Sequence, residues 1–557
     1  MKNKIFLQNP DQLLVKKSFD LKSALKIIDK GEQQICFIVN QKKQLIATLT
    51  DGDLRRAIIN GKSLSCKLEN IKLRKPIFIR YEELDKDISK FLNSRIKILP
   101  CIDRNNKLLG YIRYKDIVKE DSIRSREICI LGCGYVGLTL ALVMARCGFN
   151  VKGYDTNKKL ISNLKNYKPP FFEKGIDSLL NQQLNKNFQA TSLVSDIVKC
   201  DTYIISVGTP ISKLKKPNYS YLKKSIKTLS KLLKKGDLVI LRSTVPIGTS
   251  RKILIDLLEK ENQMKVGKDF YISFCPERTV EGNALLELTK NPQIIGGYCE
   301  KSAEISMKIF NEITHTVINA ETLEAAELSK LIDNSYRDTI FAYSNQMSLL
   351  ASKYKINFSK LVDKINLGYS RNFIPKPSPG VGGPCLTKDP YILNNSLTEE
   401  KINYSLVNSA RLTNEIMPKK ICDVIYKNLR ILKKNKKKIR IFITGLAFKG
   451  NPETSDLRNS TSLEILNILK KNRNNSIFLH DFVLDKIKYK IKNFKFIKLE
   501  DGFKNSDVIL ILNNHQNYES ISYNLLKKIK KNTIIFDAWQ MLFEKLNNDK
   551  KIIYKYV

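Results

Sequence analysis

The stretch that decides the fold of this chain is ICILGCGYVGLTLALVMARCGFNVKGYD, residues 128–155. The apolar run 128–131 predicts a short buried strand, the turn GCGYVG at 132–137 leads into an apolar helix at 138–147, and 151–155 predicts a second strand. This is a Gly-x-Gly-x-x-Gly fingerprint in the strand–turn–helix context that dinucleotide binding requires. The stretch therefore predicts a Rossmann unit with a dinucleotide site.

Each glycine of the turn, and the acid that ends the second strand, has its own task. Gly132 permits the tight turn, Gly134 lets a pyrophosphate approach the backbone, and Gly137 lets the helix pack on the strand. The helix N-terminus then faces the phosphates. Asp155 stands where a carboxylate binds the ribose 2′-hydroxyl and repels a 2′-phosphate, which favours NAD over NADP.

Further apolar runs extend this unit into a sheet and then into a second one. Strands are predicted at 202–207, 238–245 and 270–274, with helical stretches between them, which is typical of a parallel doubly wound sheet. Residues 298–367 contain neither glycine nor proline, so 321–354 can form one helix of about 50 Å. A second strand–turn–helix unit begins at 439–445, and later strands are predicted at 506–512 and 533–537. The predicted fold class is α/β, with two Rossmann-like doubly wound domains joined by a long central helix.

One cysteine is placed for chemistry. In GVGGPCLTKDP, residues 380–390, Cys385 follows a glycine run, and Lys388 and Asp389 follow three and four residues later. A thiol with charged groups beside it can act as a nucleophile. A nucleophilic thiol together with a hydride-accepting cofactor predicts an enzyme that carries an alcohol past the aldehyde, through a thiohemiacetal and a thioester, to an acid.

The bulk composition excludes several classes of protein. The net charge is +42, but the lysines are spread along the whole chain, so we expect a solvated basic surface rather than nucleic-acid binding. Three scattered histidines and eleven cysteines without a Cys-x-x-Cys pair predict no metal site and a reducing, cytoplasmic location. Glycines interrupt the apolar stretch 128–145, so we expect no membrane insertion.

The first 120 residues contain an internal repeat. Residues 39–54 align without gaps to 102–117, and each copy predicts a strand, a polar turn, a second strand and a helix start. This resembles a tandem cystathionine-beta-synthase (CBS) domain, an α+β module that often binds adenosine nucleotides. Thr50 and Asp53 match that family's phosphate- and ribose-binding pair, whereas the second copy has Arg113 with Asp116. A packing or assembly module without a ligand is the alternative.

From about residue 127 onward the chain resembles the UDP-glucose/GDP-mannose dehydrogenase family, whose members oxidise C6 of a nucleotide sugar to a carboxylate with two NAD. The resemblance covers about three quarters of the chain and rests on several separate motifs. Besides the fingerprint at 132–137 these are Val207-Gly208-Thr209-Pro210, Ser243-Thr244-Val245-Pro246, Pro276-Glu277-Arg278 with Glu281-Gly282, Glu327-Leu328-Ser329-Lys330 with Asn334, Gly382-Gly383-Pro384-Cys385, and Gly445-Leu446-Ala447-Phe448-Lys449 with Asp456-Leu457-Arg458.

The resemblance implies roles for individual residues. Cys385 is the nucleophile, and Lys330 and Asn334, one helical turn apart, stabilise negative charge on the C6 oxygen. Glu277 activates water for thioester hydrolysis, and Asp389 and Thr244 hold an ordered water and assist proton transfer. The implied cofactor contacts are Gly132, Gly134, Tyr135, Val136, Gly137, Asp155, Thr209, Glu281 and Arg458. The implied substrate contacts are Lys376, Gly380, Gly382, Phe448 and Lys449, with Arg371 near the place of an arginine that the family supplies from a neighbouring subunit.

The resemblance also implies the domain plan and the partners. We expect a CBS pair at 1–122, an NAD-binding domain at 127–314, a central helical dimerisation domain at 315–432 and a UDP-sugar-binding domain at 438–557. The expected protein is a homodimer or higher homo-oligomer that makes precursors of surface polysaccharides.

The chain departs from the family at three places. Pro384 precedes the cysteine where many relatives carry His or Ser, and Arg242 stands where relatives often have Glu or Lys. Pro276-Glu277-Arg278 resembles members that act on N-acetylhexosamine sugars, with plain UDP-glucose as the alternative. Two other functions stay open: a two-electron β-hydroxyacid-type dehydrogenase, which needs no Cys385, and a non-catalytic protein that senses nucleotides or binds nucleic acid.

Overall fold

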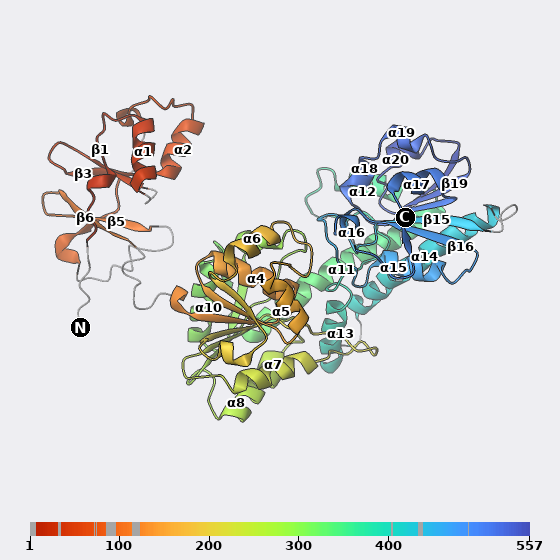
Figure 1. Ribbon diagram of the computed structural model, residues 1–557, viewed down its shortest axis with the longest axis horizontal. Coiled ribbons are helices and arrows are strands. Elements are labelled where there is room, and N and C mark those ends of the chain that lie inside the picture. The colour runs from red at the N-terminus through yellow and green to blue at the C-terminus, as the bar shows by residue number, and fades with distance from the viewer. Residues whose placement is uncertain are drawn as a thin grey trace. The chain divides into compact units, whose positions relative to one another are not determined.

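The computed structural model describes residues 7–31, 35–71, 73, 75–84, 96–113, 123–371, 373–402, 405–432, 438–487 and 489–557. The chain divides into two compact units, Met1–Ser122 and Ile123–Val557 (Figure 1).

The first unit repeats one strand arrangement twice. One three-stranded sheet contains β1 (Leu14–Val15), β2 (Ile35–Val39) and β3 (Leu45–Thr50), and the other contains β4 (Ile79–Arg80), β5 (Ile98–Ile102) and β6 (Leu108–Arg113). β2 pairs with β3, and β5 with β6, in antiparallel ladders whose registers shift at Ile38/Val39 and at Cys101/Ile102, matching positions of the two sequence copies. Helices α1 (Leu21–Gly31) and α2 (Asp51–Ile59) belong to the first copy. The strand–turn–strand repeat is therefore present, while Asp116 lies outside the described residues.

The second unit begins with the N-terminal lobe, an eight-stranded sheet in the order β14-β13-β12-β11-β10-β7-β8-β9. All its pairs are parallel except β12 with β13. The strands are β7 (Glu127–Leu131), β8 (Asn150–Tyr154), β9 (Phe188–Thr191), β10 (Thr202–Ile205), β11 (Leu238–Leu241), β12 (Tyr271–Phe274), β13 (Gln293–Gly297) and β14 (Val317–Asn319). The helices are α4 (Tyr135–Arg146), α5 (Lys158–Lys165), α6 (Ile176–Gln183), α7 (Ser220–Ser230), α8 (Asp256–Asn262), α9 (Ala284–Lys290) and α10 (Glu300–Asn311).

Helices cover both faces of this sheet, which explains why its strands are apolar throughout. On β7, Ile128 and Ile130 belong to one buried cluster, and Cys129 and Leu131 belong to the cluster on the opposite face. Helix α4 begins three residues earlier than expected, because Gly137 packs inside its first turn rather than before it.

A group of helices connects this lobe to the next. They are α11 (Leu323–Lys353), α12 (Phe358–Asn366), α13 (Asp389–Glu399) and α14 (Leu406–Leu432), of which α11 and α14 are much the longest. The predicted single helix across 321–354 is confirmed, and the Thr322 hydroxyl caps it by accepting a hydrogen bond from the Ala325 N–H. Helix α11 packs on β13 and on α14, which packs in turn on α15 of the following lobe.

Helix α11 has an unusual distribution of side chains. The face toward α13 and α14 buries polar residues, among them Lys330, Asn334, Asp338 and Asn345. The exposed side carries large apolar residues from its third turn onward, Ile332, Tyr336, Tyr343 and Leu350, and Tyr354 follows directly after the helix. A surface helix normally has the reverse arrangement, so both faces need an explanation.

The C-terminal lobe is a parallel six-stranded sheet in the order β17-β16-β15-β18-β19-β20. Its strands are β15 (Ile439–Thr444), β16 (Asn475–His480), β17 (Lys495–Phe496), β18 (Val508–Ile511), β19 (Thr533–Asp537) and β20 (Ile552–Lys555). Its helices are α15 (Thr461–Leu469), α16 (Phe482–Lys486), α17 (Leu499–Asn505), α18 (Gln516–Glu519), α19 (Tyr523–Leu526) and α20 (Phe543–Leu546). The predicted α/β fold with two Rossmann-like sheets is confirmed.

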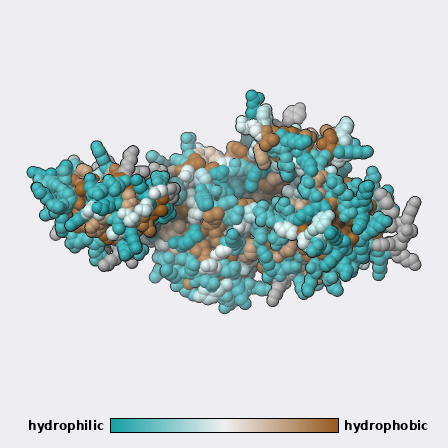
Figure 2. All heavy atoms as spheres, turned by 90° about the horizontal axis from the view of Figure 1, so that it is seen from above, coloured by the Kyte–Doolittle hydropathy of each residue, from teal (hydrophilic) through white to brown (hydrophobic). Residues whose placement is uncertain are grey.

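Hydrophilic residues dominate the face of the molecule seen in Figure 2. Within the described residues, no helix combines the length and the apolar character needed to cross a membrane.

Candidate active site

The glycine turn of the N-terminal lobe is shaped for a phosphate group. Gly132 has a φ of 100°, and a Cβ on Gly137 would lie 1.8 Å from the Gly132 carbonyl oxygen. Gly134 caps the N-terminus of α4, and apart from its chain neighbours no heavy atom of the described residues comes within 4 Å of where its Cβ would be. The open N-terminus of a twelve-residue helix thus faces free space, as a pyrophosphate requires.

Asp155 lies beside this turn at the end of β8. One of its oxygens accepts a hydrogen bond from the Cys133 N–H at 2.9 Å and the other accepts one from the Asn157 N–H at 2.8 Å. The carboxylate is only partly buried and has acceptor positions left for a ribose hydroxyl. Thr209 lies nearby in the fold, where its hydroxyl donates to the Thr244 carbonyl after β11. These residues follow neighbouring parallel strands, where nucleotides bind in such sheets, so they fit NAD.

Tyr135 and Val136 occupy the first turn of α4. The Tyr135 hydroxyl is hydrogen-bonded to the buried Glu173 and accepts from the Gly282 N–H at 3.0 Å. Glu173 also accepts from the Gly282 and Ala284 N–H groups, at 2.7 and 2.9 Å. Glu173, which no sequence motif indicated, connects the cofactor turn to the loop that carries Glu281.

Glu281 joins the two lobes. Its carboxylate accepts hydrogen bonds from Arg458 at 3.1 Å and from the Thr454 hydroxyl at 3.2 Å, and Lys449 donates to its carbonyl oxygen at 2.6 Å. Burial, followed by the charge of Asp456, raises the pKa of Glu281 to about 7 against the opposing cations. Burial also lowers the pKa of Lys449 to about 8.

Cys385 lies in the turn before α13, where its carbonyl oxygen accepts from the Lys388 and Asp389 N–H groups at 3.0 and 2.9 Å. Its side chain is accessible to solvent, yet protein encloses it enough that burial is the main cause of a raised thiol pKa. Asp389 raises this pKa further, whereas Lys330 and then Lys388 lower it. The cysteine therefore lies among the charged groups that the sequence predicted around it.

Lys330 and Asn334 lie together on the buried face of α11. The Asn334 amide donates to Asp389 at 2.5 Å, and Lys388 donates to the other oxygen of Asp389 at 2.5 Å. Asp389 is fully buried, and each of its oxygens retains one acceptor position. This places a cation, an amide donor and a carboxylate with spare acceptor capacity around the Cys385 segment.

Glu277 has a different environment. One of its oxygens accepts from Arg242 Nε and Nη2, at 3.1 and 2.7 Å, and the other accepts from the Arg278 and Thr279 N–H groups, both at 2.8 Å. Burial alone would raise the pKa of Glu277, but Arg242 and then Lys330 outweigh it and hold the pKa below its usual value. All four acceptor positions of the carboxylate are therefore filled.

The expected substrate residues divide into two groups. Gly380 and Gly382 lie where a Cβ would contact the Asn414 and Asn459 carbonyl oxygens, at 2.8 and 2.6 Å, so this loop packs closely on α14 and on the C-terminal lobe. Phe448 packs against Gly383 in the same place. In contrast, Lys376 pairs with Asp363 of α12 at 3.0 Å, and Arg371 is exposed on the chain before it.

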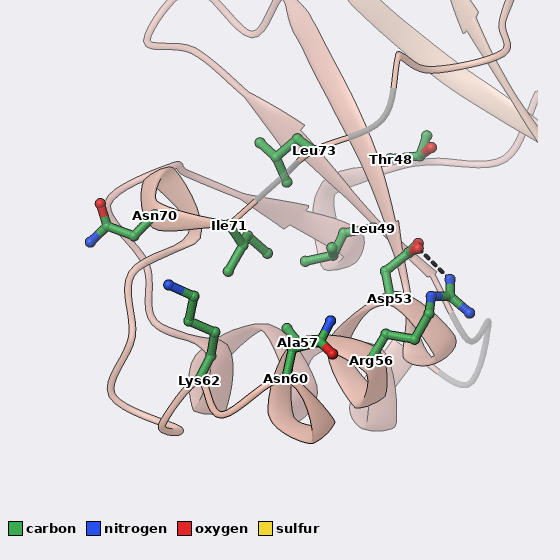
Figure 3. A pocket seen from close by; sticks show the side chains of 10 residues that line it. All are labelled: Thr48, Leu49, Asp53, Arg56, Ala57, Asn60, Lys62, Asn70, Ile71 and Leu73. Atoms are coloured by element: carbon green, nitrogen blue, oxygen red, sulfur yellow. Dashed lines mark hydrogen bonds and ion pairs between the residues drawn. The ribbon is translucent and has the colours of Figure 1, made fainter.

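The first unit contains a cavity of about 420 Å³ beside α2 (Figure 3). Asp53 pairs with Arg56 at its wall, and Asn60, Lys62 and Asn70 are also among its lining residues. Thr50 does not line the cavity; it forms a capping box with Asp53 at the start of α2. The predicted pair therefore has a structural task, although Asp53 also reaches the cavity.

Three family models cover most of the second unit. They are the UDP-glucose/GDP-mannose dehydrogenase family's NAD-binding domain at 126–314, its central domain at 324–416 and its UDP-binding domain at 442–544. The chain belongs to the UDP-glucose/GDP-mannose dehydrogenase family. It is thus an NAD-dependent oxidoreductase of the nucleotide-sugar dehydrogenase type.

Individual relatives support the same membership. A UDP-N-acetyl-D-mannosamine dehydrogenase of Pyrococcus horikoshii is 32% identical over 75% of this chain and 96% of its own length. One of Campylobacter jejuni is 31% identical over 70% and 96%. The solved structure of the Pyrococcus horikoshii protein matches with a TM-score of 0.69 at 30% identity, covering 77% of this chain and 99% of that one.

Several residues that build the site were missed in the sequence. Asp338 stands two helical turns after Lys330 on the polar face of α11, and this spacing could have indicated it. Arg411 and Asn414, both on α14, contact Asp338. Only the tertiary structure brings these groups together.

Proposed function

We propose that the protein oxidises C6 of UDP-N-acetyl-D-mannosamine, a UDP-N-acetylhexosamine, to the corresponding uronic acid with two NAD, supplying a precursor of surface polysaccharide. The observation that carries this proposal is Cys385 enclosed by Lys330, Lys388 and Asp389 next to the contact between the lobes. The relatives at 30–32% identity act on this sugar by their names, which supports it over UDP-glucose. A two-electron dehydrogenase would leave this arrangement around Cys385 without a use.

NAD, when bound, supplies the hydride acceptor for each of the two oxidations. Asp389 assists the departure of the C6 hydroxyl proton through an ordered water as the aldehyde forms, because its buried carboxylate has acceptor positions left. Cys385 Sγ then bonds to C6, and its proton passes to the C6 oxygen, giving a thiohemiacetal. Loss of the second hydride and of the hydroxyl proton leaves a thioester, and water releases the acid and restores the thiol. Lys330 and Asn334 donate to the C6 oxygen while it carries negative charge.

The water-activating role of Glu277 stays a prediction. As placed here, its carboxylate must release one of its four donors before it can accept a proton from water. Thr244, which follows β11 and accepts a hydrogen bond from the Thr209 hydroxyl, is proposed to hold an ordered water together with Asp389.

The test is a panel of UDP-sugars incubated with NAD while the absorbance of NADH is followed. We expect UDP-N-acetyl-D-mannosamine to give the highest kcat/KM, with UDP-glucose and UDP-N-acetylglucosamine far lower. A higher kcat/KM for UDP-glucose would overturn the sugar assignment but not the reaction class.

We also propose that the protein is a homodimer built on the exposed apolar side of α11. Tyr336, Tyr343 and Tyr354 are 64%, 53% and 72% exposed there, and aromatic residues are enriched in interfaces between subunits. Light scattering should give twice the chain mass for the wild type and the chain mass for Tyr336→Glu with Tyr343→Glu. Tyr221→Glu, a change at an exposed tyrosine on α7, is the matched control and should stay dimeric. A monomeric wild type would contradict the proposal.

We further propose that residues 1–122 form a CBS pair that binds an adenosine nucleotide, with the other domain limits at 127–314, 315–432 and 438–557. The cavity beside α2 supports this, since Lys62 and Arg56 suit a phosphate and Asn60 and Asn70 suit a base or ribose. ATP, ADP and AMP should each be tested for a rise in melting temperature. Lys62→Glu should abolish the rise, whereas Lys42→Glu on an exposed turn should not; no rise with any nucleotide would favour a packing module.

Finally, we place the protein in the cytoplasm. All eleven cysteines, each within the described residues, are free thiols, as a reducing compartment allows.

A further inference from the structure

Among the described residues, the largest fully buried side chains are two arginines, Arg242 and Arg411. Arg242 holds Glu277, as described above. Within the described residues, the hydrogen bonds and ion pairs of Arg411 go to no expected site residue, so its burial needs another reason. A buried guanidinium is tolerated where its charge is paired and most of its donors are bonded; among the described residues Arg411 Nε has no hydrogen-bond partner, so the contacts of its two Nη groups must explain its burial.

Arg411 donates hydrogen bonds to main-chain carbonyl groups on either side of Cys385 in the sequence. Its Nη2 donates to the Val381 carbonyl at 3.1 Å, and its Nη1 donates to the Leu386 carbonyl at 3.0 Å. Val381 precedes Cys385 and Leu386 follows it directly. The same Nη1 donates to Asp338 at 2.8 Å, so the planar fork is fixed on α11 while it holds both ends of the loop.

The anchor of this arginine is the helix that carries the oxyanion donors. Asp338 lies one turn beyond Asn334 and two turns beyond Lys330, on the same buried face of α11. Asn414, one turn after Arg411 on α14, donates to the Asp338 carboxylate and to its carbonyl, both at 2.8 Å. The Arg411–Asp338 contact therefore couples the nucleophile loop to Lys330 and Asn334.

A second set of contacts fixes the start of the same loop. Asn345, also on the buried face of α11, accepts from the Ser378 N–H at 2.8 Å and donates to Asn414 at 2.9 Å. The Ser378 hydroxyl donates to the Gly380 carbonyl at 3.0 Å. The polar face of α11 is thus explained: it holds the loop from 378 to 386 through main-chain groups.

We propose that Arg411 is a positioning residue, which holds Cys385 at a fixed distance from Lys330 and Asn334 by clamping the Val381 and Leu386 carbonyls to Asp338. The inference rests on the proposed function of Cys385 as nucleophile. Lysine cannot replace it, because a single ammonium does not reproduce a fork that spans two carbonyls and a carboxylate.

The test combines turnover with peptide-resolved alkylation of the cysteines by iodoacetamide in the full chain. In Arg411→Lys we expect kcat to fall about 10²-fold, the cost of a nucleophile displaced by about 1 Å. Alkylation of Cys385 should rise at least tenfold, because the loosened loop opens the protein enclosure around a thiol that is already partly accessible. Cys422, buried on the same helix as Arg411, and Cys275 should stay protected, which shows that the fold is intact.

Arg242→Lys is the matched control, since it removes an equally buried arginine from the N-terminal lobe. It should leave the Cys385 alkylation rate within about twofold of the wild type. Unchanged Cys385 alkylation in Arg411→Lys, or an equal rise in both variants, overturns the proposal. If Arg411→Lys fails to fold, Asp338→Asn replaces it, with the same direction and a smaller rise expected.

The alkylation result does not depend on the reaction. A rise at Cys385 in Arg411→Lys, together with full turnover in Cys385→Ser, would support the positioning role and overturn the proposed function. The alkylation experiment therefore tests the positioning role of Arg411, and the turnover of Cys385→Ser separately tests the nucleophile role of Cys385.

Discussion

The loop after the first strand differs sharply between the two lobes. In the N-terminal lobe only residues 132–134 separate β7 from α4, so the helix N-terminus stays open. In the C-terminal lobe residues 445–460 separate β15 from α15, and Thr454 and Arg458 of this bridging segment contact Glu281 of the other lobe. The short loop leaves room for a ligand, whereas the long one uses the same position in the fold to join the lobes.

The aspartate that follows the second strand of each Rossmann-like unit also differs between the lobes. Asp155 accepts two main-chain hydrogen bonds and stays partly exposed. Asp481, its counterpart after β16, is buried and accepts four, from the N–H groups of Leu446, Ala447, Val483 and Leu484. One carboxylate is available for recognition, and the other is fully used by the fold.

The largest effect should come from Cys385, which belongs to neither of the two sheets. Cys385→Ser should lower the turnover of UDP-N-acetyl-D-mannosamine at least about 10³-fold, since the covalent step is lost. NAD binding, measured by fluorescence quenching, should be unchanged. Turnover within tenfold of the wild type would contradict the role of Cys385 as the nucleophile of the reaction.

The two glycine turns should respond differently to an added methyl group. Gly137→Ala places a Cβ 1.8 Å from the Gly132 oxygen, so NAD affinity should be lost along with about 1–3 kcal/mol of stability. Gly445→Ala, whose Cβ would lie 2.6 Å from Asn513, should lower stability by a similar amount and leave NAD affinity intact. Calorimetric titration with NAD and thermal unfolding measure both. Loss of NAD affinity in Gly445→Ala would contradict the assignment of NAD binding to the glycine turn of the N-terminal lobe.

The two acids provide a subtler test. Asp155→Asn should raise the ratio of kcat/KM with NADP to that with NAD about tenfold, because the charge that repels the 2′-phosphate is gone. Asp481→Asn should leave this ratio unchanged and lower stability by about 1–3 kcal/mol, since an amide group would face main-chain donors. An equal change of the NADP-to-NAD ratio in both variants would contradict the assignment of cofactor recognition to Asp155 alone.

The smallest effect concerns the pH dependence of the contact between the lobes. Because its pKa is raised from 4.5 to about 7 in the folded protein, Glu281 keeps its proton where the unfolded chain has released it. Its contribution to stability therefore falls as pH rises from 4.5 to about 7. The melting temperature of Glu281→Gln relative to the wild type should rise between pH 5 and pH 8. A constant difference would mean that the carboxylate is ionised throughout.

What the sequence predicted correctly was encoded locally. The glycine turn and Asp155 lie within one strand–turn–helix–strand unit, and the uninterrupted helix follows from the absence of glycine and proline across its length. Lys330 and Asn334 are one turn apart on that helix, so their shared face followed from spacing.

What could not be predicted depends on contacts between distant segments. Glu281 and Arg458 lie 177 residues apart, and Asp338 and Arg411 lie 73 apart. Arg242 and Glu277 follow two neighbouring strands, so only the side-chain geometry shows that Arg242 fills acceptor positions of the Glu277 carboxylate. A residue type in a motif gives a role, but its hydrogen-bond partners determine whether it can accept a proton.

The most direct test of the account is the number of NADH formed per UDP-N-acetyl-D-mannosamine consumed by the wild-type protein, with the products separated by anion-exchange chromatography. We expect two NADH per sugar and a carboxylated product, because Cys385 would retain the half-oxidised sugar until the second oxidation. One NADH per sugar, with free aldehyde released, would contradict it.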